Sequence, residues 1–356
     1  MNLFSLFRNH PTFAHGGVHP LEHKDETAGL PIRRMPFAPR LVVPLSQHKG
    51  APAKPIVKAG QEVVRGEPVA VADGYVSVPM HAPATGRVSA VDLWATAEGP
   101  KAPAIVIDVY DGATQEILYE DPVDILHLAA DEIVQAVKDA GLVGLGGAAF
   151  PSHVKLLPPD GKSIHTVVVN GCECEPYLTC DHRVMLEHTD ALLRGIRIVM
   201  RATGATRALV GVEDNKMDAV RVIREKLAGD DAIQVRAVKT KYPQGAERML
   251  IESLLKQQIP QKGLPVDLGV AVYHVGTLAQ VGDLLPAGRG LIERVVTVSG
   301  AGVARPGNYL VPIGTPVGFL LQQVGADAEA TKVILGGPMM GMAVASLDVP
   351  ITKGAS

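Results

Sequence analysis

The sequence has few aromatic residues and lacks any long apolar run. Phe, Trp and Tyr together make up 4% of the 356 residues, so the core must consist mainly of Val, Leu, Ile and Ala. No apolar stretch approaches the roughly 18 residues that a membrane-spanning helix requires. The apolar stretch in the opening MNLFSLFRNH is too short for a signal peptide. We therefore expect a cytoplasmic location.

An excess of one charge and a disulfide pattern are also missing. The formal net charge is −3 with both signs interspersed, which gives no reason to expect a nucleic-acid-binding face. The three cysteines, Cys172, Cys174 and Cys180, fall in one short segment. An odd, clustered set argues against a disulfide framework and favours reduced thiols in a reducing compartment. The length predicts two to three domains.

Glycine and proline are abundant, with 37 and 27 residues, which predicts many tight turns. Residues 36–115 alternate apolar and polar positions between these residues, as expected of a small all-β domain. The segments AGQEVVRGEPVA and HAPATGRV resemble the barrel-sandwich domains that carry lipoyl or biotinyl groups. The segment VADGYVSV has no lysine where those domains carry the modified one, so we expect the fold without the swinging-arm function.

Residues 116–290 alternate apolar runs with amphipathic stretches, which predicts an α/β domain with a mainly parallel sheet. The expected strands are IHTVVVNG, RALVGVED and IQVRAVKT, each typical of a strand buried on both faces. The expected helices are DEIVQAVKDAG, DHRVMLEHTDALLRGIRIVMRATGA, NKMDAVRVIREKLAG and QGAERMLIESLLKQQ. Residues 291–350 predict two strands, a short helix and a further strand, and resemble a β-grasp domain of the soluble-ligand-binding type.

Residues 1–35 show no clear periodicity, and we expect them to form an arm that packs on the body. The segment HPLEHK places His19 and His23 at the H-x-x-x-H spacing of a helical metal pair. Pro20 lies between the two histidines and argues against a helix. A metal pair and a plain packing arm are the two readings of this segment.

A glycine-rich segment, GLGGAAFP, follows the first helix of the α/β domain. The segment matches the dinucleotide fingerprint G-x-G-x-x-A at Gly144, Gly146 and Ala149, with Gly147 between them, but that motif must follow a strand. From the motif alone, the glycines fit a structural turn as well as a ligand site. Their use in a site would be to let the backbone approach a phosphate or a flat ring, with Lys155 placed to meet a phosphate charge.

The segment NGCECEP lies at the end of a buried strand, and ligands of open α/β sheets bind at the carboxyl ends of strands. The three nearby thiols could bind zinc or part of an iron–sulfur cluster. However, the spacing C-x-C-x5-C supplies three ligands where such sites use four. We expect a loop that lines a cofactor, without metal, and no residue that acts as a general base or nucleophile.

Together these two segments resemble the flavoprotein subunit of respiratory complex I. GLGGAAFP, NGCECEP and CDHR stand in the places of that family's glycine loop, N-x-D-E-S-E-P and K-D-R motifs. The chain is more similar still to the RnfC family of the Rnf/Rsx ion-translocating complexes. The shared motifs are HP-x-x-H-K, GGAAFPSHVKL, NGCECEPYLTCDHR, KYPQGAER, ERVVTVSG and GGPMMG, from about residue 15 to 353.

This resemblance implies an FMN site and, beside it, an NADH site. The residues implied for the FMN phosphate and ribityl chain are Gly144, Gly146, Gly147 and Lys155. Those implied to line the flavin are Asn170, Cys172, Glu173 and Cys174, with His274 where complex I has an asparagine near the phosphate. Those implied to face NADH are Phe150, Glu175, Tyr242 and Glu247.

Several positions differ from complex I and make the expected site less polar. Leu145 replaces an arginine, Cys172 and Cys174 replace Asp and Ser, and Ala246 replaces one of two adjacent glutamates. Members of the Rnf family also carry two C-x-x-C-x-x-C-x-x-x-C-P motifs after the β-grasp domain. This sequence contains neither, so we expect the two [4Fe–4S] clusters only in a longer form of the protein.

The resemblance implies the electron-input subunit of a membrane-bound, ion-translocating complex, with the other Rnf/Rsx subunits as partners. Hydride would pass from NADH to FMN and then, as electrons, to the iron–sulfur clusters. The protein would be peripheral, on the cytoplasmic face of the bacterial inner membrane, and soluble as the stretch given. The alternatives are a flavin-free scaffold subunit of the same complex and a related cobalamin-reductase subunit. The residues leave open the ion, the electron acceptor and the direction of flow.

Overall fold

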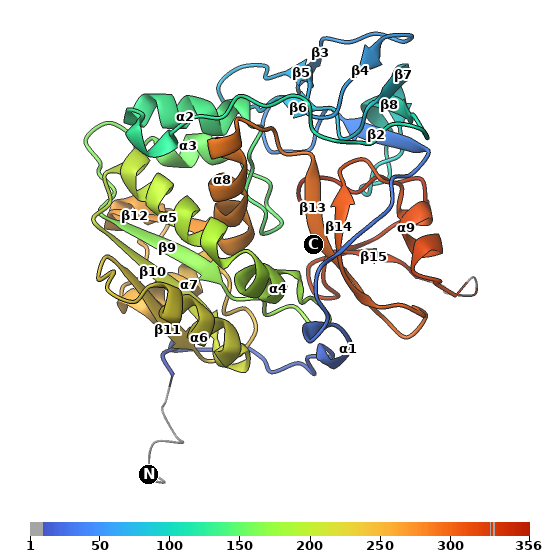
Figure 1. Ribbon diagram of the computed structural model, residues 1–356. Helices are drawn as coiled ribbons and strands as arrows, with labels where there is room; N and C mark the ends of the chain where they lie inside the picture. Colours follow the sequence, from blue (N-terminus) through green and yellow to red (C-terminus); the bar gives the residue numbers. More distant parts are fainter. Residues whose placement is uncertain (1–9, 328, 330–331) are drawn as a thin grey trace.

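The computed structural model describes residues 10–327, 329 and 332–356, so the first nine residues of the expected arm lie outside the described residues. Figure 1 shows three parts of the chain. An α/β part lies on the left, a β part on the upper right, and a second β part with one helix below it. This mixture of a parallel α/β part with two β parts confirms the predicted fold class.

A four-stranded parallel sheet with the order β11–β10–β9–β12 forms the centre of the α/β part. Its strands are β9 (Thr166–Gly171), β10 (Arg207–Glu213), β11 (Ile233–Val238) and β12 (Val270–His274). The sequence predicted the first three but not β12. The chain first adds strands on one side of β9 and then places β12 on its other side. The strand order therefore reverses between β9 and β12.

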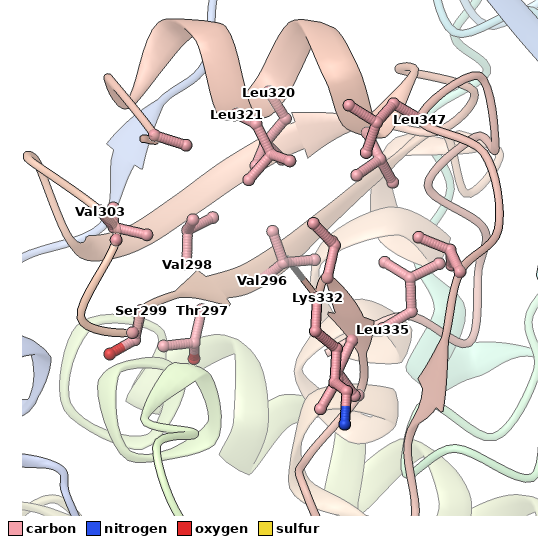
Figure 2. Close-up of a pocket in the computed structure, with 18 of the residues that line it drawn as sticks. Val296, Thr297, Val298, Ser299, Val303, Leu320, Leu321, Lys332, Leu335 and Leu347 are labelled. Atoms are coloured by element: carbon pink, nitrogen blue, oxygen red, sulfur yellow. The ribbon is translucent and has the colours of Figure 1, made fainter. Parts of the chain in front are cut away.

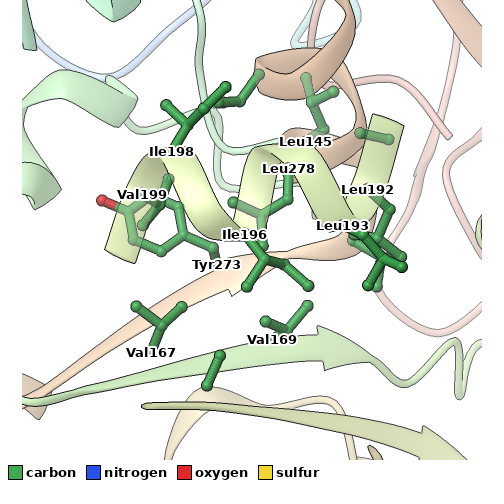
Figure 3. Close-up of a cluster of buried hydrophobic side chains, with 14 of the residues drawn as sticks. Leu145, Val167, Val169, Leu192, Leu193, Ile196, Ile198, Val199, Tyr273 and Leu278 are labelled. Carbon is green, nitrogen blue, oxygen red and sulfur yellow. The ribbon is translucent and has the colours of Figure 1, made fainter. Parts of the chain in front are cut away.

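Helices cover both faces of this sheet. One face carries α2 (Ala130–Asp139), α3 (Ser152–Leu156), α4 (Cys180–Glu187), α5 (Thr189–Thr203), α6 (Met217–Lys226) and α8 (Val275–Ala287), and the other carries α7 (Glu247–Leu255). Val167 and Val169 point toward α5 (Figure 3), whereas Val168 packs on the α7 side. This alternation explains the continuous apolar run of β9, because both faces of the strand are buried. Three 3-10 segments complete the part: Ile125–His127, Asp214–Lys216 and Pro265–Leu268.

The prediction of a single helix after NGCECEP is wrong. The structure has two helices there, α4 and α5, which meet at His188. His188 has φ −113° and ψ 28°, outside the helical region. The Thr189 hydroxyl donates to the carbonyl of Met185 at 2.7 Å and so takes the acceptor that the next backbone N–H of a continuous helix would use. The break lets α5 turn and pack along α8.

Two glycines allow α5 and α8 to approach closely. A Cβ at Gly195 would lie 1.8 Å from the carbonyl oxygen of Leu278, and one at Gly282 would lie 1.9 Å from that of Ala191. No side chain fits at either position without separating the helices. This contact fixes α8, and with it the segment that begins α8 at the carboxyl edge of the sheet.

The upper β part consists of two antiparallel sheets that enclose a small apolar core. Their strands are β2 (Arg40–Pro44), β3 (Lys54–Pro55), β4 (Glu62–Val63), β5 (Pro68–Val71), β6 (Met80–His81), β7 (Gly86–Trp94) and β8 (Ala102–Val109). The other β part contains β13 (Glu293–Val298), β14 (Gly307–Pro312), α9 (Val317–Gln323), β15 (Ile334–Leu335) and β16 (Met342–Ala343). The arm adds α1 (Asp25–Ala28) and β1 (Arg33–Arg34), which pairs in parallel with β14.

A buried lysine joins all three parts. Lys353 follows the second β part, and its ammonium donates to the carbonyl of Gly141 in the α/β part at 2.7 Å. It also donates to the carbonyl of Pro79 in the upper β part at 3.0 Å. Burial lowers the pKa of Lys353 to about 7. The three parts therefore meet at one hydrogen-bonded point.

Candidate functional site

The expected site residues gather where the strand order reverses. Asn170 lies near the end of β9 and His274 ends β12, so both lie at the carboxyl edge of the sheet. In open α/β sheets, ligands bind in the crevice outside this edge, at the point of reversal. The glycine-rich segment, α3 and the loop after β9 all approach this edge, and the site is built from them.

The glycine-rich segment forms a tight turn after α2 and is not preceded by a strand, as the sequence indicated. The N–H of Gly144 donates to the carbonyl of Phe150 at 2.8 Å, which closes the turn. A Cβ at Gly146 would lie 3.0 Å from Cδ2 of His274, so Gly146 lets the turn rest against that ring. Gly147 has φ +96° and open space where a Cβ would lie. The turn thus offers bare backbone beside His274.

His274 is held at both ring nitrogens. Its Nδ1 accepts from the N–H of Gly276 at 3.2 Å and caps α8, so Nε2 carries the hydrogen that it shares with Asp181 Oδ2 at 2.8 Å. Burial alone would raise the pKa of Asp181, but its interaction with His274 holds it below its usual value. The ring edge that faces Gly146 is therefore fixed in orientation.

Asn170 brings two of the predicted motifs together. Its Nδ2 donates to the carbonyl of Gly245 in KYPQGAER at 2.8 Å, and its Oδ1 accepts from the N–H of Cys172 at 3.0 Å. A Cβ at Gly245 would lie 3.0 Å from the carbonyl oxygen of Cys172. Glycine at position 245 therefore lets the two loops approach this closely without a shift of the backbone.

Lys155 and Glu247, predicted for different ligands, lie beside one another. Nζ of Lys155 on α3 is 3.7 Å from Oε2 of Glu247, the first residue of α7, and donates to the carbonyl of Val272 at 3.3 Å. The two side chains are 36% and 42% exposed, and ion pairs this open contribute little. The ammonium of Lys155 is therefore free to exchange its partner for an anion.

A buried ionic network behind the site was missed from the sequence. Glu213 ends β10, as Asn170 nearly ends β9, and its Oε2 accepts from Lys216 Nζ at 2.9 Å. The same oxygen accepts from the N–H of Glu173 at 3.0 Å. Burial alone would lower the pKa of Lys216, but Glu213 and then Glu173 raise it above its usual value. The signal was available, because a charged residue at the end of a buried strand indicates a site at that edge.

Glu173 is the most enclosed of the predicted flavin-lining residues. Its Oε1 accepts from the N–H of Asp181 at 2.8 Å, and its Oε2 has no hydrogen-bond partner among the described residues. Lys24 Nζ lies 4.0 Å from that second oxygen. Burial raises the pKa of Glu173, and Lys24 opposes the shift.

The predicted NADH residues are joined only in part. The carboxylate of Glu175 accepts from the backbone N–H groups of Met339 and Met340, at 3.0 and 2.8 Å, in the GGPMMG loop of the second β part. A cavity of about 100 Å³ has Tyr242 in its wall together with Cys174. No hydrogen bond in the described part of the chain joins Phe150 to Glu175 or Tyr242, and Phe150 belongs to the glycine turn.

The three cysteines do not converge on one point. Cys172 packs in the cluster on the α7 side of the sheet, whereas Cys180 packs in the cluster on the α5 side. The ligand atoms of Glu173, Cys180 and Asp181 do lie within 4.8 Å of one another, but this trio contains a single thiol. The absence of a metal at the three thiols stays a prediction, which elemental analysis of the purified protein can test.

We predict that the native thiols react slowly. Burial raises the pKa of Cys172 and Cys180 well above the usual value and that of Cys174 to about 11. At pH 8 all three are therefore protonated, and the thiolate is the nucleophile. Titration with a disulfide reagent should give less than about one fast-reacting thiol in the native protein and three in denaturant. Three fast thiols in the native protein would show that the loop is open.

A larger cavity, of about 680 Å³, lies in the second β part and contains none of the predicted site residues. Figure 2 shows Leu320 and Leu321 of α9 on one side of it and Val296 and Val298 of β13 on the other. Its lining is mainly apolar, and it includes Tyr177 and Leu178 of the loop after β9. In the described part of the chain, no helix combines the length and the apolar character needed to cross a bilayer.

Three family models match the chain in sequence order. They are the RnfC barrel sandwich hybrid domain at residues 12–112, the Nuo51 FMN-binding domain at residues 137–283, and the SLBB domain at residues 295–343. The FMN-binding match covers the parallel sheet, the glycine turn and the loop after β9. The site described above therefore lies inside the matched FMN-binding domain.

The chain is also similar to curated proteins over nearly its whole length. It is 41% identical to the C-subunit of the proton-translocating ferredoxin:NAD+ oxidoreductase complex of Clostridium ljungdahlii, over 96% of the chain and 75% of that protein. It is 39% identical to the C-subunit of the Na+-translocating complex of Acetobacterium woodii, over 98% and 78%. An NAD+-reducing [NiFe]-hydrogenase structure shares the fold, with a TM-score of 0.55 and 24% identity over 65% of this chain and 46% of that one.

Proposed function

Since this chain belongs to the RnfC family, the C-subunits of ion-translocating ferredoxin:NAD+ oxidoreductase complexes, we propose that its site exchanges hydride between NADH and a bound FMN. The chain is an oxidoreductase subunit of a multi-subunit complex, and its central domain is an FMN-binding domain. The observation that supports the proposal most is the position of the glycine turn. It lies at the reversal of strand order, against His274, with open space beside Gly147.

The residues present fit FMN. Gly146 and Gly147 leave the backbone of the turn bare, so that a phosphate or a ribityl chain can approach it. Lys155 lies on α3, which follows the turn in the sequence, and its ammonium is only weakly paired. Asn170 and Cys172 lie where β9 ends, at the edge of the sheet where a ligand would bind. In this arrangement Gly144, Gly146, Gly147 and Lys155 hold the phosphate end, and the loop after β9 lines the ring.

FMN, when bound, supplies the ability to take two electrons as hydride and release them singly. The chain's own residues supply position and charge. His274, fixed by Asp181 and by its cap on α8, supports the turn. Glu175 and Glu247 form the border of the open side of the site, where NADH would lie. The site needs no general base or nucleophile, and its work is to orient two flat rings and exclude water.

A reconstitution experiment tests the proposal. Purified protein incubated with FMN should turn yellow and retain the flavin through gel filtration, and NADH should then bleach it in a stopped-flow spectrometer. A colourless protein after reconstitution would support the flavin-free scaffold instead. A yellow protein that NADH does not bleach would exclude NADH as the electron donor.

We predict that Lys155→Ala weakens FMN binding. Removing a charge-assisted hydrogen bond to phosphate costs about 1–3 kcal/mol, a factor of about 5 to 150 in the dissociation constant. Fluorescence titration of free FMN measures this constant. Lys162→Ala is a suitable control, because Lys162 is paired with Asp267, away from the turn. Equal affinity in the wild type and in Lys155→Ala would remove Lys155 from the phosphate site.

We predict that Glu247→Gln raises the apparent KM for NADH more than it lowers FMN content. The substitution keeps the size of the side chain but removes the charge at the start of α7. Stopped-flow bleaching at increasing NADH concentration gives the KM, and the absorbance of the bound flavin gives the FMN content. Loss of flavin with normal NADH kinetics would move Glu247 to the FMN side.

We place the chain on the cytoplasmic face of a bacterial membrane, bound to the other subunits of its complex. The support is that its relatives are subunits of ion-translocating complexes. Two [4Fe–4S] clusters would carry electrons onward from FMN in a longer form of the protein. The test reconstitutes the membrane subunits either with residues 1–356 or with a longer form that carries the clusters. Electron transfer measured in the two samples shows whether residues 1–356 relay electrons alone. We expect that they do not.

A further inference from the structure

The HPLEHK segment of the arm lies against the loop after β9. The Lys24 ammonium donates to the carbonyls of Glu173 and Glu175, each at 2.9 Å, and to the carbonyl of Leu178. An ammonium has three N–H donors, and all three are used on this one loop. Lys24 is buried, which limits the access of water to these contacts. The segment is therefore an anchor for the loop that carries Glu175.

Two more contacts attach the arm to the same loop. The N–H of Tyr177 donates to the carbonyl of Glu22 at 2.9 Å. The ring of His23 stacks on the ring of Tyr177, with centroids 4.8 Å apart and planes 9° from parallel. Lys24 and its neighbours thus hold the loop on both sides of Glu175.

The arm also holds Tyr242, the other half of the expected NADH wall. Val18 and Tyr242 exchange two backbone hydrogen bonds of 2.8 Å, one in each direction. The cavity of about 100 Å³ noted above is enclosed by His19 and Lys24 from the arm and by Cys174 and Tyr242 from the body. One short segment therefore fixes the spacing between two residues that lie more than sixty positions apart in the sequence.

We propose that Lys24 is a positioning residue for NADH, which it serves by holding Glu175 in place through the loop backbone. The inference rests on the proposed function. It concerns NADH more than FMN because Glu173 keeps its anchors to Asp181 and Glu213 when Lys24 is removed. The carboxylate of Glu175 is held by the N–H groups of Met339 and Met340, but among the hydrogen bonds of the described residues Lys24 is the one partner of the Glu175 and Leu178 carbonyls.

The test compares Lys24→Met, Lys24→Arg and the control Lys58→Met, an exposed lysine in the upper β part. Each protein is loaded with FMN, and the bleaching of the bound flavin is followed at increasing NADH concentration. We expect Lys24→Met to raise the KM for NADH about tenfold or more, with limiting rate and FMN affinity within about threefold of wild type. Lys24→Arg should recover most of the loss, and Lys58→Met should behave as wild type.

Other outcomes separate the two proposals. If NADH does not bleach the wild type, the proposed function fails. If the wild type is bleached and Lys24→Met has an unchanged KM, only the role of Lys24 is overturned. If Lys24→Met loses flavin, limiting rate and thermal stability together, Lys24 has a structural role only. That result would also overturn the proposal.

A milder variant covers the case in which Lys24→Met does not fold. His23→Asn removes the stack on Tyr177 at an exposed site, and asparagine tolerates the φ of +49° found there. It should raise the KM about two- to threefold with unchanged flavin content. An unchanged KM in this folded variant would contradict the proposal.

Discussion

Lys216→Met should destabilise the protein by about 3–5 kcal/mol, the usual cost of leaving one partner of a buried ion pair without the other. Lys216 and Glu213 are almost completely buried, with Nζ and Oε2 2.9 Å apart. After the substitution, the Glu213 carboxylate would keep the N–H of Glu173 but lose its counter-ion. Denaturant unfolding followed by circular dichroism gives the free energy of unfolding.

Lys226→Met is the matched control for this measurement. Lys226 also pairs with a carboxylate, Asp190, at 2.7 Å, but the two side chains are 41% and 72% exposed. An ion pair that open contributes about 0–1 kcal/mol. If both variants lose the same small amount, the buried pair has no special role in stability. Because Glu213 also accepts from Glu173, the Lys216 variant should bind FMN less tightly, whereas the Lys226 variant should not.

Gly282→Ala should destabilise the protein by about 3 kcal/mol, at the upper end of the cost of overpacking. The new Cβ would lie 1.9 Å from the carbonyl oxygen of Ala191, which is backbone and can move only with α5. Alanine recovers about 1 kcal/mol through its higher helix propensity, which is too little to offset the displacement. Because His274 caps α8, FMN affinity should fall together with stability.

The control for this substitution is Gly29→Ala, at the end of α1. A Cβ there meets nothing within 4 Å, and the φ of −82° suits any residue. Its free energy of unfolding should stay within about 0.5 kcal/mol of wild type. A Gly282→Ala variant as stable as this control would mean that α5 and α8 can separate freely.

The sequence indicated the parallel sheet because buried strands and amphipathic helices alternate clearly along most of the central domain. It did not indicate β12 and α8, because VAVYHVGTLAQVGDLL runs from strand to helix without a break. His274 is both the last residue of β12 and the cap of α8. Neither the two-residue repeat of a strand nor the 3.6-residue repeat of a helix is therefore complete around it. The break between α4 and α5 was missed for a similar reason, since no Gly or Pro marks His188.

The expected site residues came from resemblance and motif, and the structure adds the residues that hold them. Lys24, Asp181 and Glu213 contact Glu173 from the arm, from α4 and from β10. These contacts join positions up to 149 residues apart, and no local pattern encodes such a distance. The polar partner of Glu175 is likewise invisible in the sequence, because it is backbone N–H of the GGPMMG loop.

The arm also has a consequence for folding kinetics. β1 pairs with β14 in the register Arg33 to Tyr309, and Asn308 donates to the carbonyl of Thr27 across 281 residues. Closing loops of this length costs chain entropy, and proteins rich in such distant contacts fold slowly. The parallel sheet is built from successive strand–helix–strand units, so its strands pair by closing shorter loops of the chain. The sheet should therefore form first, and the wall that we propose faces NADH should be among the last parts of the molecule to become ordered.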